Sequence, residues 1–190
     1  QPLYPYAVSK HYGAELVKYW NKIYGIPYNI MCIFNAYGPR VKTTGAYGAV
    51  FGVFFKQKLD NKPYTVVGDG NQKRDFVYVS DVAEAFYLAA ISDINSQVFN
   101  IGSGAPKTIN KLIKLIGDGD RVSLPFRPGE PLITHANISK ISNLLGWKPS
   151  VSFEDGVNIM LENISYWKNA PLWDKQKIEN ATQEWFKYLN

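Results

Sequence analysis

Tyr6 and Lys10 form the pair of residues whose types and spacing best suit proton transfer. They lie four positions apart in the sequence Tyr6-Ala-Val-Ser-Lys10, so on a helix both side chains lie on one face, about one turn apart. A nearby ammonium group favours the phenolate form of a tyrosine, and a tyrosine in that form can act as a general base. The same spacing also fits a tyrosine at a helix start followed by a solvated lysine. The spacing by itself leaves both interpretations open.

Arg74 and Arg127 are the candidate anion-binding residues. Arg74 lies in Lys73-Arg-Asp75, and Arg127 begins the sequence Arg127-Pro-Gly-Glu130. A planar guanidinium group offers paired donors that match the oxygens of a phosphate. Taken alone, either arginine is better explained as a surface residue, and only a shared context favours a phosphate site.

Alternating helices and strands are expected to position these side chains. Residues 9–24 should form a helix, because apolar residues recur near helical spacing and Gly25 and Pro27 follow. Residues 28–34 should form a buried strand that leads into a turn at 35–40. Further strands are expected at 64–67, 76–79 and 98–101, and further helices at 47–59, 82–90, 109–116, 138–145 and 153–167, with a last short helix near the C-terminus. This alternation predicts an α/β fold with parallel strand pairing.

Two of the expected helices begin after residues that suit a helix N-cap. Ser80 or Asp81 is expected to cap the helix at 82–90, and Thr108 to cap the helix at 109–116. Both helices follow a short apolar strand, so the pattern of strand, cap and helix occurs twice.

Composition excludes several classes of protein. The 190 residues are 46% apolar, 15% aromatic and 19% charged, as is typical of a globular protein. The single cysteine, Cys32, and the histidines His11 and His135 provide neither a disulfide framework nor the spacing of a zinc site, so no metal is expected. The longest apolar run, near residues 48–55, is far shorter than the ~20 residues of a membrane span, and no signal peptide precedes it. We therefore expect a cytoplasmic protein without a membrane partner.

The charge of the chain favours an anionic ligand. Lys and Arg number 21 against 16 Asp and Glu, which gives a net charge of +5 and a pI near 9.1. The basic residues are spread along the chain and form no recognised nucleic-acid-binding motif, so nucleic acid is not expected as a partner. A small phosphorylated ligand fits this charge equally well.

Several motifs occur in a fixed order along the chain. They are PYAVSKHYGAE, FNAYGPR, GDGNQKRDFVYVSDVAEAF, FNIGSG, RPGEP and ISKISNLLGWKPSVSFEDGV. This series resembles the extended short-chain dehydrogenase/reductase family of nucleotide-sugar epimerases, dehydratases and decarboxylases, and within it the UDP-glucose 4-epimerase-like enzymes. The chain departs from the family pattern at Asn137, where an aspartate is usual.

The resemblance implies roles for residues near the N-terminus of the chain. Tyr6 would be the catalytic base or acid, and Lys10 would support it and hold the nicotinamide ribose of NAD. Tyr6, Lys10 and Phe34 would contact this cofactor. None of these roles follows from spacing alone.

The resemblance also implies a site for the substrate, a nucleotide-diphosphate sugar. Asn35 would contact the substrate at the end of a strand, where open α/β sheets bind ligands. Arg74 and Arg127 would bind the pyrophosphate, and Glu130 the ribose hydroxyls of the nucleotide.

The fold that the resemblance implies is the C-terminal part of a Rossmann-like parallel sheet with a small α/β substrate-binding domain. Residues 1–40 and 76–107 would belong to the first, and residues 41–75 and 108–190 to the second. The glycine-rich dinucleotide fingerprint and the family's catalytic serine or threonine are not found in the sequence. We therefore expect a C-terminal portion of an enzyme that is a homodimer when intact.

The expected reaction is NAD-dependent epimerisation through a transient 4-keto sugar. A 4,6-dehydratase or a uronic acid decarboxylase is an alternative within the family. A non-catalytic chain that binds a nucleotide sugar or a protein partner is an alternative of a different class. The chain alone is expected to bind NAD weakly, to be inactive, and to self-associate or fold only in part.

Overall fold

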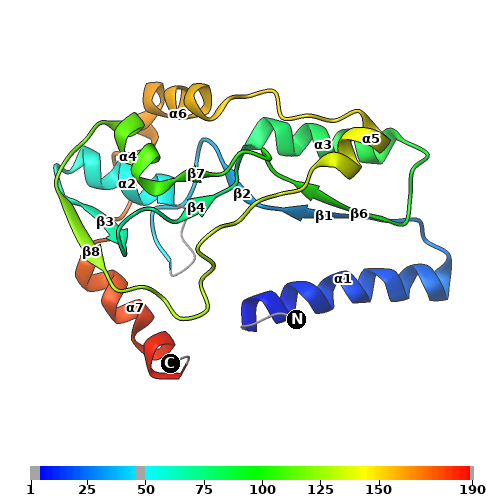
Figure 1. Ribbon diagram of the computed structural model, residues 1–190, viewed down its shortest axis with the longest axis horizontal. Coiled ribbons are helices and arrows are strands. Elements are labelled where there is room, and N and C mark those ends of the chain that lie inside the picture. The colour runs from blue at the N-terminus through cyan, green and yellow to red at the C-terminus, as the bar shows by residue number, and fades with distance from the viewer. Residues whose placement is uncertain (1–4, 46–49, 189–190) are drawn as a thin grey trace.

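The structure, a computed structural model, describes residues 5–45 and 50–188. Helices and short strands, most of them paired in parallel, gather around two hydrophobic clusters (Figure 1). The α/β fold class with parallel pairing is confirmed. The α3 cluster and the α2 cluster take their names from helices α3 (Val79–Ile91) and α2 (Val50–Leu59), which contribute to them.

The α3 cluster is built on one parallel strand pair. Strand β1 (Asn29–Ile33) pairs with β6 (Gln97–Ile101), with Asn29 opposite Gln97 and Ile33 opposite Ile101. Helices α3 (Val79–Ile91) and α5 (Ser139–Leu145) supply side chains to this core. Its buried members are Val77, Val82, Ala85, Phe99, Ile101, Ile141 and Trp147.

The α2 cluster is larger and rich in aromatic rings. Its helices are α2 (Val50–Leu59), α4 (Ile109–Ile116) and α6 (Phe153–Glu162), followed by the 3₁₀ helix η1 (Ile164–Trp167). Strand β3 (Tyr64–Val67) pairs in parallel with β8 (Arg121–Leu124) beside them. The ring of Tyr37 stacks on that of Phe51 with centroids 4.4 Å apart, and Phe76 stacks on Phe153 at 5.2 Å. Helix α7 (Lys175–Tyr188) ends the described chain.

Short strands join the two clusters in the middle of the molecule (Figure 1). Strand β2 (Asn35–Tyr37) pairs in parallel with β5 (Phe76–Tyr78), and β4 (Lys73–Arg74) pairs antiparallel with β7 (Lys107–Thr108). Arg74 is therefore the last residue of β4, and β5 begins two residues later, at Phe76.

Helix α1 (Pro5–Tyr24) has no buried residue. In the view of Figure 1 it runs below β1 and β6, with its N-terminal end directed toward the loop that follows β8. Many of its large apolar side chains are exposed: Tyr12, Leu16, Val17, Tyr19, Trp20, Ile23 and Tyr24. A helix with so much uncovered apolar surface has a face suited to packing against another element.

Most of the expected elements are confirmed, with shifted ends. The helix expected at 9–24 begins at Pro5, and the one expected at 47–59 is described from Val50, since residues 47–49 lie outside the described residues. Thr108 caps α4 as expected, because its Oγ1 accepts a hydrogen bond from the Lys111 N–H at 3.0 Å. The helix expected at 153–167 is interrupted at Asn163, where α6 gives way to η1.

Three expectations about local structure were wrong. Strand β1 is not fully buried: Ile33 is 44% exposed, because β1 has a single strand neighbour among the described residues. Residues 35–37, expected in a turn, form β2 because β5 offers their backbone a parallel partner. Neither Ser80 nor Asp81 caps α3, which begins at Val79 after Tyr78.

Asp81 has a structural role instead of the expected capping role. Its carboxylate is buried and accepts hydrogen bonds from the Ser150 hydroxyl at 2.6 Å and the Val151 N–H at 3.2 Å. The Asp81 carbonyl also accepts a hydrogen bond from the indole of Trp147 at 2.9 Å. These bonds fix the segment between α5 and α6 against the start of α3.

The division of the chain into two domains stays a prediction. Helix α5 and Trp147, which the prediction places in the substrate-binding domain, pack in the α3 cluster. Tyr37 and Phe76, which it places with the Rossmann-like part, pack in the α2 cluster. The two clusters therefore share segments across the predicted boundaries.

Candidate functional site

Tyr6 and Lys10 lie in the first turns of α1. The Lys10 Nζ atom lies over the Tyr6 ring, 5.3 Å from its centroid, within the range of a cation–π contact. The Tyr6 side chain is 47% exposed, and its carbonyl accepts a hydrogen bond from the Ser9 hydroxyl at 2.7 Å. The helix thus holds an ammonium group beside an exposed phenol, as the one-turn spacing predicts.

Phe34 and Asn35 connect β1 to β2. The Phe34 N–H donates to the carbonyl of Ile101 at 2.9 Å, so this residue continues the pairing of β1 with β6. The Asn35 Oδ1 atom accepts a hydrogen bond from the Thr134 hydroxyl at 3.0 Å. Within the described residues the Asn35 amide nitrogen donates no hydrogen bond, so it is the part of this side chain suited to a ligand. The position at the carboxyl end of a parallel strand is the expected one.

Arg74, Arg127 and Glu130 converge in space. The Arg74 Nη2 atom lies 2.7 Å from one oxygen of Glu130, and the Arg127 Nη1 atom lies 3.9 Å from the other. The two guanidinium groups therefore meet at one carboxylate, although the arginines come from distant parts of the sequence. The three groups together carry one net positive charge, which leaves the cluster attractive to an anion.

The three side chains of this cluster are largely sheltered from solvent. The exposed fractions are 11% for Arg74, 17% for Arg127 and 30% for Glu130. The Arg74 Nη1 atom also donates to the carbonyl of Pro131 at 2.8 Å. Sheltered, ion-paired arginines are held in place in a way that free surface arginines are not, so the surface interpretation loses its main support.

Glu130 has a spare acceptor beside the arginines. Its Oε2 atom is buried and, among the described residues, accepts no hydrogen bond. A buried carboxylate oxygen without a hydrogen-bond donor is unfavourable. A ligand hydroxyl at this position would supply the missing donor, which is the type of contact expected between Glu130 and a ribose.

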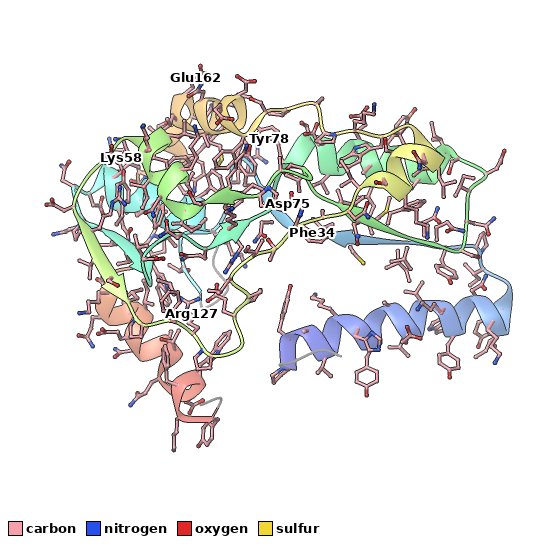
Figure 2. All side chains as sticks on the ribbon, in the orientation of Figure 1. Phe34, Lys58, Asp75, Tyr78, Arg127 and Glu162 are labelled. Carbon is pink, nitrogen blue, oxygen red and sulfur yellow. The ribbon has the colours of Figure 1, made fainter. Side chains whose placement is uncertain are left out.

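Asp75 is a central residue that the sequence analysis did not single out. Its fully buried carboxylate accepts hydrogen bonds from the Ser103 hydroxyl at 2.8 Å, the Gly104 N–H at 3.1 Å and the Ala136 N–H at 2.8 Å. Its own N–H donates to the Thr134 hydroxyl at 3.0 Å. Figure 2 shows Asp75 near Phe34, in the middle of the molecule. The sequence signal that could have identified Asp75 is its position, directly after Arg74 and directly before an apolar strand.

Two cavities lie near the arginine cluster, on the side of β8 and α7. The smaller, of about 130 Å³, is lined by Leu124, Pro125, Arg127, Ile178, Glu179, Thr182 and Phe186. The larger, of about 620 Å³, is lined by Gly68, Asp69, Ser123, Leu124, Pro125, Phe126, Lys175 and Glu179. Arg127 is the one cationic side chain in the lining of the smaller cavity, and Figure 2 shows it beside α7.

The larger cavity is not itself suited to a diphosphate. Hydrogen bonds from the backbone and side chain of Asn71 hold the pKa of Asp69 below its usual value, so this carboxylate is negatively charged at neutral pH. Glu179 is a second acidic residue in the lining, against one cation, Lys175. The lining of this cavity is therefore less attractive to an anion than the cluster of Arg74, Arg127 and Glu130.

The described residues provide no cluster of metal ligands and no membrane-crossing helix. No group of three His, Cys, Asp or Glu side chains within residues 5–45 and 50–188 is placed to hold a metal ion. In the same part of the chain, every helix is too short or too polar to cross a membrane.

Comparison with known proteins gives consistent similarities. Residues 1–102 match the family described as the NAD dependent epimerase/dehydratase family. The chain is 37% identical over 161 residues to a putative UDP-glucose 4-epimerase of Methanocaldococcus jannaschii, covering 82% of this chain and 52% of the relative. It is 34% identical over 185 residues to a UDP-glucuronate 4-epimerase of Thermodesulfobacterium geofontis, covering 94% and 52%. The chain thus spans about half the length of the curated relatives it matches.

A solved structure is similar in fold as well as in sequence. It is a UDP-glucuronic acid 4-epimerase from Bacillus cereus in complex with UDP-glucuronic acid and NAD. The TM-score is 0.79 and the identity 36%, covering 87% of this chain and 54% of that one. The expected likeness to Rossmann-fold epimerases is confirmed.

Proposed function

Because this chain belongs to the NAD-dependent epimerase/dehydratase family, we propose that it supplies the proton-transfer pair and the substrate site of a nucleotide-sugar 4-epimerase. The observation that carries this proposal is the convergence of Arg74 and Arg127 on Glu130. Two sheltered guanidinium groups that face one point match the two phosphates of a nucleotide-diphosphate sugar. The substrate class is therefore a sugar activated by a nucleoside diphosphate.

The proposed site binds the pyrophosphate, the ribose and the sugar of the ligand through different residues. Arg74 and Arg127 hold the pyrophosphate through charge-assisted hydrogen bonds, and Glu130 keeps both guanidinium groups oriented before the ligand arrives. The Oε2 atom of Glu130, which lies within ion-pair distance of Arg127 but accepts no hydrogen bond among the described residues, accepts one from a ribose hydroxyl. The amide N–H of Asn35, at the carboxyl end of β1, donates a hydrogen bond to the sugar.

The residues described here fit the nicotinamide ribose end of NAD. Lys10 carries three donors beside an exposed phenol at the start of α1. Tyr6, Lys10 and Phe34 would hold this end of the cofactor. The 190 residues contain no glycine-rich turn for the dinucleotide pyrophosphate, so that part of NAD requires residues outside this chain. When bound, NAD accepts and returns the hydride at C4 of the sugar.

Tyr6 is proposed to move the proton in both directions. The phenolate oxygen takes the proton of the C4 hydroxyl as the C4 hydrogen leaves as a hydride, and the C4–O bond becomes a carbonyl. The ammonium group of Lys10, which lies over the Tyr6 ring, is the cation proposed to assist this transfer. When the hydride returns to the opposite face of the 4-keto sugar, Tyr6 gives the proton back and the configuration at C4 is inverted.

Two other outcomes are compatible with the same first step. Elimination of water before the hydride returns would make the enzyme a 4,6-dehydratase, and loss of carbon dioxide from a 4-keto uronic acid would make it a decarboxylase. A non-catalytic protein that binds a nucleotide sugar is the second candidate function. The observation that favours it is the cluster of Arg74, Arg127 and Glu130, which needs no cofactor to bind a nucleotide sugar.

Incubation of the complete protein with NAD and either UDP-glucose or UDP-glucuronic acid tests these functions, with the sugar products followed by NMR. The proposal predicts the C4 epimer of at least one substrate. A sugar product that has lost the elements of water would identify a dehydratase instead, and one that has lost carbon dioxide would identify a decarboxylase. Binding of the nucleotide sugar without turnover would support the non-catalytic alternative and contradict the proposed reaction.

A further inference from the structure

The C-terminal segment is firmly attached to the α2 cluster before it reaches the arginine site. Three carbonyl groups between residues 168 and 173 accept hydrogen bonds from side chains on or near α2, each 2.9 Å long. The bonds run from Thr43 to Pro171, from Lys56 to Lys168 and from Gln57 to Trp173. Since Lys56 and Gln57 are buried, this attachment belongs to the folded core.

Helix α7 extends from this attachment along the loop that carries Arg127. Asp174 caps the helix, because its carboxylate accepts a hydrogen bond from the Lys177 N–H at 3.0 Å. Ile178 is 5% exposed and Thr182 is 3% exposed. Both residues line the smaller cavity together with Arg127. The buried face of α7 is therefore directed at the arginine site.

Trp185 makes a direct polar contact with the arginine loop. Its indole Nε1–H donates to the carbonyl of Pro128 at 2.9 Å. Pro128 follows Arg127 in a turn that the Glu130 N–H closes by donating to the Arg127 carbonyl at 3.2 Å. Gly129 in this turn has a φ of 75°, which is easy for glycine and not for most residues. One bond inside the turn and one from α7 thus fix its conformation.

We propose that Trp185 is a positioning residue for the diphosphate site. By holding the Pro128 carbonyl, it keeps the turn in the conformation in which Arg127 and Glu130 meet Arg74. This inference rests on the proposed function, because it assigns α7 a part in binding the same nucleotide-diphosphate sugar. A turn that is ordered before the ligand binds loses less conformational freedom on binding, so affinity increases.

The Trp185→Phe variant tests this role because it keeps an aromatic ring and removes the donor. We expect KM for the nucleotide sugar and the Kd of UDP to increase roughly 2- to 10-fold, the usual net effect of one hydrogen bond. We expect kcat at saturating substrate to stay unchanged, since the proton-transfer pair lies on α1. A residue that only supports the fold would not separate KM from kcat in this way.

The matched control is Gln183→Ala, on the exposed side of the same helix, which should leave KM, kcat and the Kd of UDP unchanged. Trp185→His keeps an aromatic ring with an N–H and should bind UDP more tightly than Trp185→Phe. Thermal unfolding without ligand identifies a variant that fails to fold. If Trp185→Phe fails to fold, the UDP affinity of Trp185→His is compared with that of the wild type instead. UDP affinity equal to wild type in folded Trp185→Phe would overturn the inference, whereas lack of UDP binding by the wild type would contradict the proposed function itself.

Discussion

At the scale of single residues, the candidate site depends on charged and aromatic side chains that neighbouring groups hold in place. Lys10 lies over the ring of Tyr6, and Glu130 lies between Arg74 and Arg127. The first pair is local, so helical spacing predicts it. The second arrangement joins β4 to the loop after β8, and no sequence pattern gives the distance between two such segments.

The Tyr6→Phe variant is expected to lower kcat of the complete enzyme by on the order of 10²- to 10⁴-fold, the usual contribution of a general acid or base. The variant removes only the phenolic oxygen, so the free energy of unfolding should change little at a side chain that is 47% exposed. Steady-state kinetics with the nucleotide sugar measures this effect.

Tyr12→Phe is the matched control, because Tyr12 lies on the same helix and is 64% exposed. It should have wild-type kcat. If Tyr6→Phe also turned over at the wild-type rate, Tyr6 would have no part in the proton transfer.

At the scale of elements, short central strands bring the site residues together. The sequence predicts the main helices and strands because their apolar periodicity and stop residues are local. It does not predict β2, β4, β7 or β8, because these short strands, unlike β3 and β5, lack a continuous run of apolar or β-branched residues and depend on the partner they meet. The same reason explains why Asp75 was missed: its partners come from two distant loops.

The Asp75→Asn variant is expected to reduce the free energy of unfolding by about 1–3 kcal/mol. An amide nitrogen in place of one carboxylate oxygen would face N–H donors such as those of Gly104 and Ala136, and at least one of these would be left without an acceptor. Urea unfolding measures the change. The exposed Asp93→Asn is the control and should be near neutral, and an equally stable Asp75→Asn would mean that the buried carboxylate does not hold these loops.

At the scale of the whole molecule, the chain has an uncovered apolar surface. Helix α1, with its exposed apolar side chains, and the half-exposed strand β1 lie at the end of the molecule that contains the α3 cluster (Figure 1). The matching relatives are about twice as long as the segment aligned with this chain. The α/β class and family resemblance follow from sequence motifs, but the share of each relative that is matched comes only from comparison.

The chain alone is expected to self-associate and to bind NAD weakly. Exposed apolar side chains on α1, such as Leu16 and Trp20, favour association, and the sequence lacks the glycine turn that holds a dinucleotide pyrophosphate. Size-exclusion chromatography with light scattering and calorimetric titration with NAD measure the two properties. Micromolar NAD binding by a monodisperse monomer would contradict both expectations.

The most direct test of the central claim is the affinity of the protein for UDP and for uridine, with and without Arg127. If Arg74 and Arg127 hold a diphosphate, calorimetric titration should show UDP binding to the wild type much more tightly than uridine. Arg127→Ala should weaken UDP by roughly 10-fold or more, the effect of losing a charge-assisted hydrogen bond, and should change uridine binding little. Arg121→Ala, which removes an exposed arginine paired with Asp118, should bind UDP as the wild type does. Equal affinities of the wild type and Arg127→Ala for UDP would contradict the account.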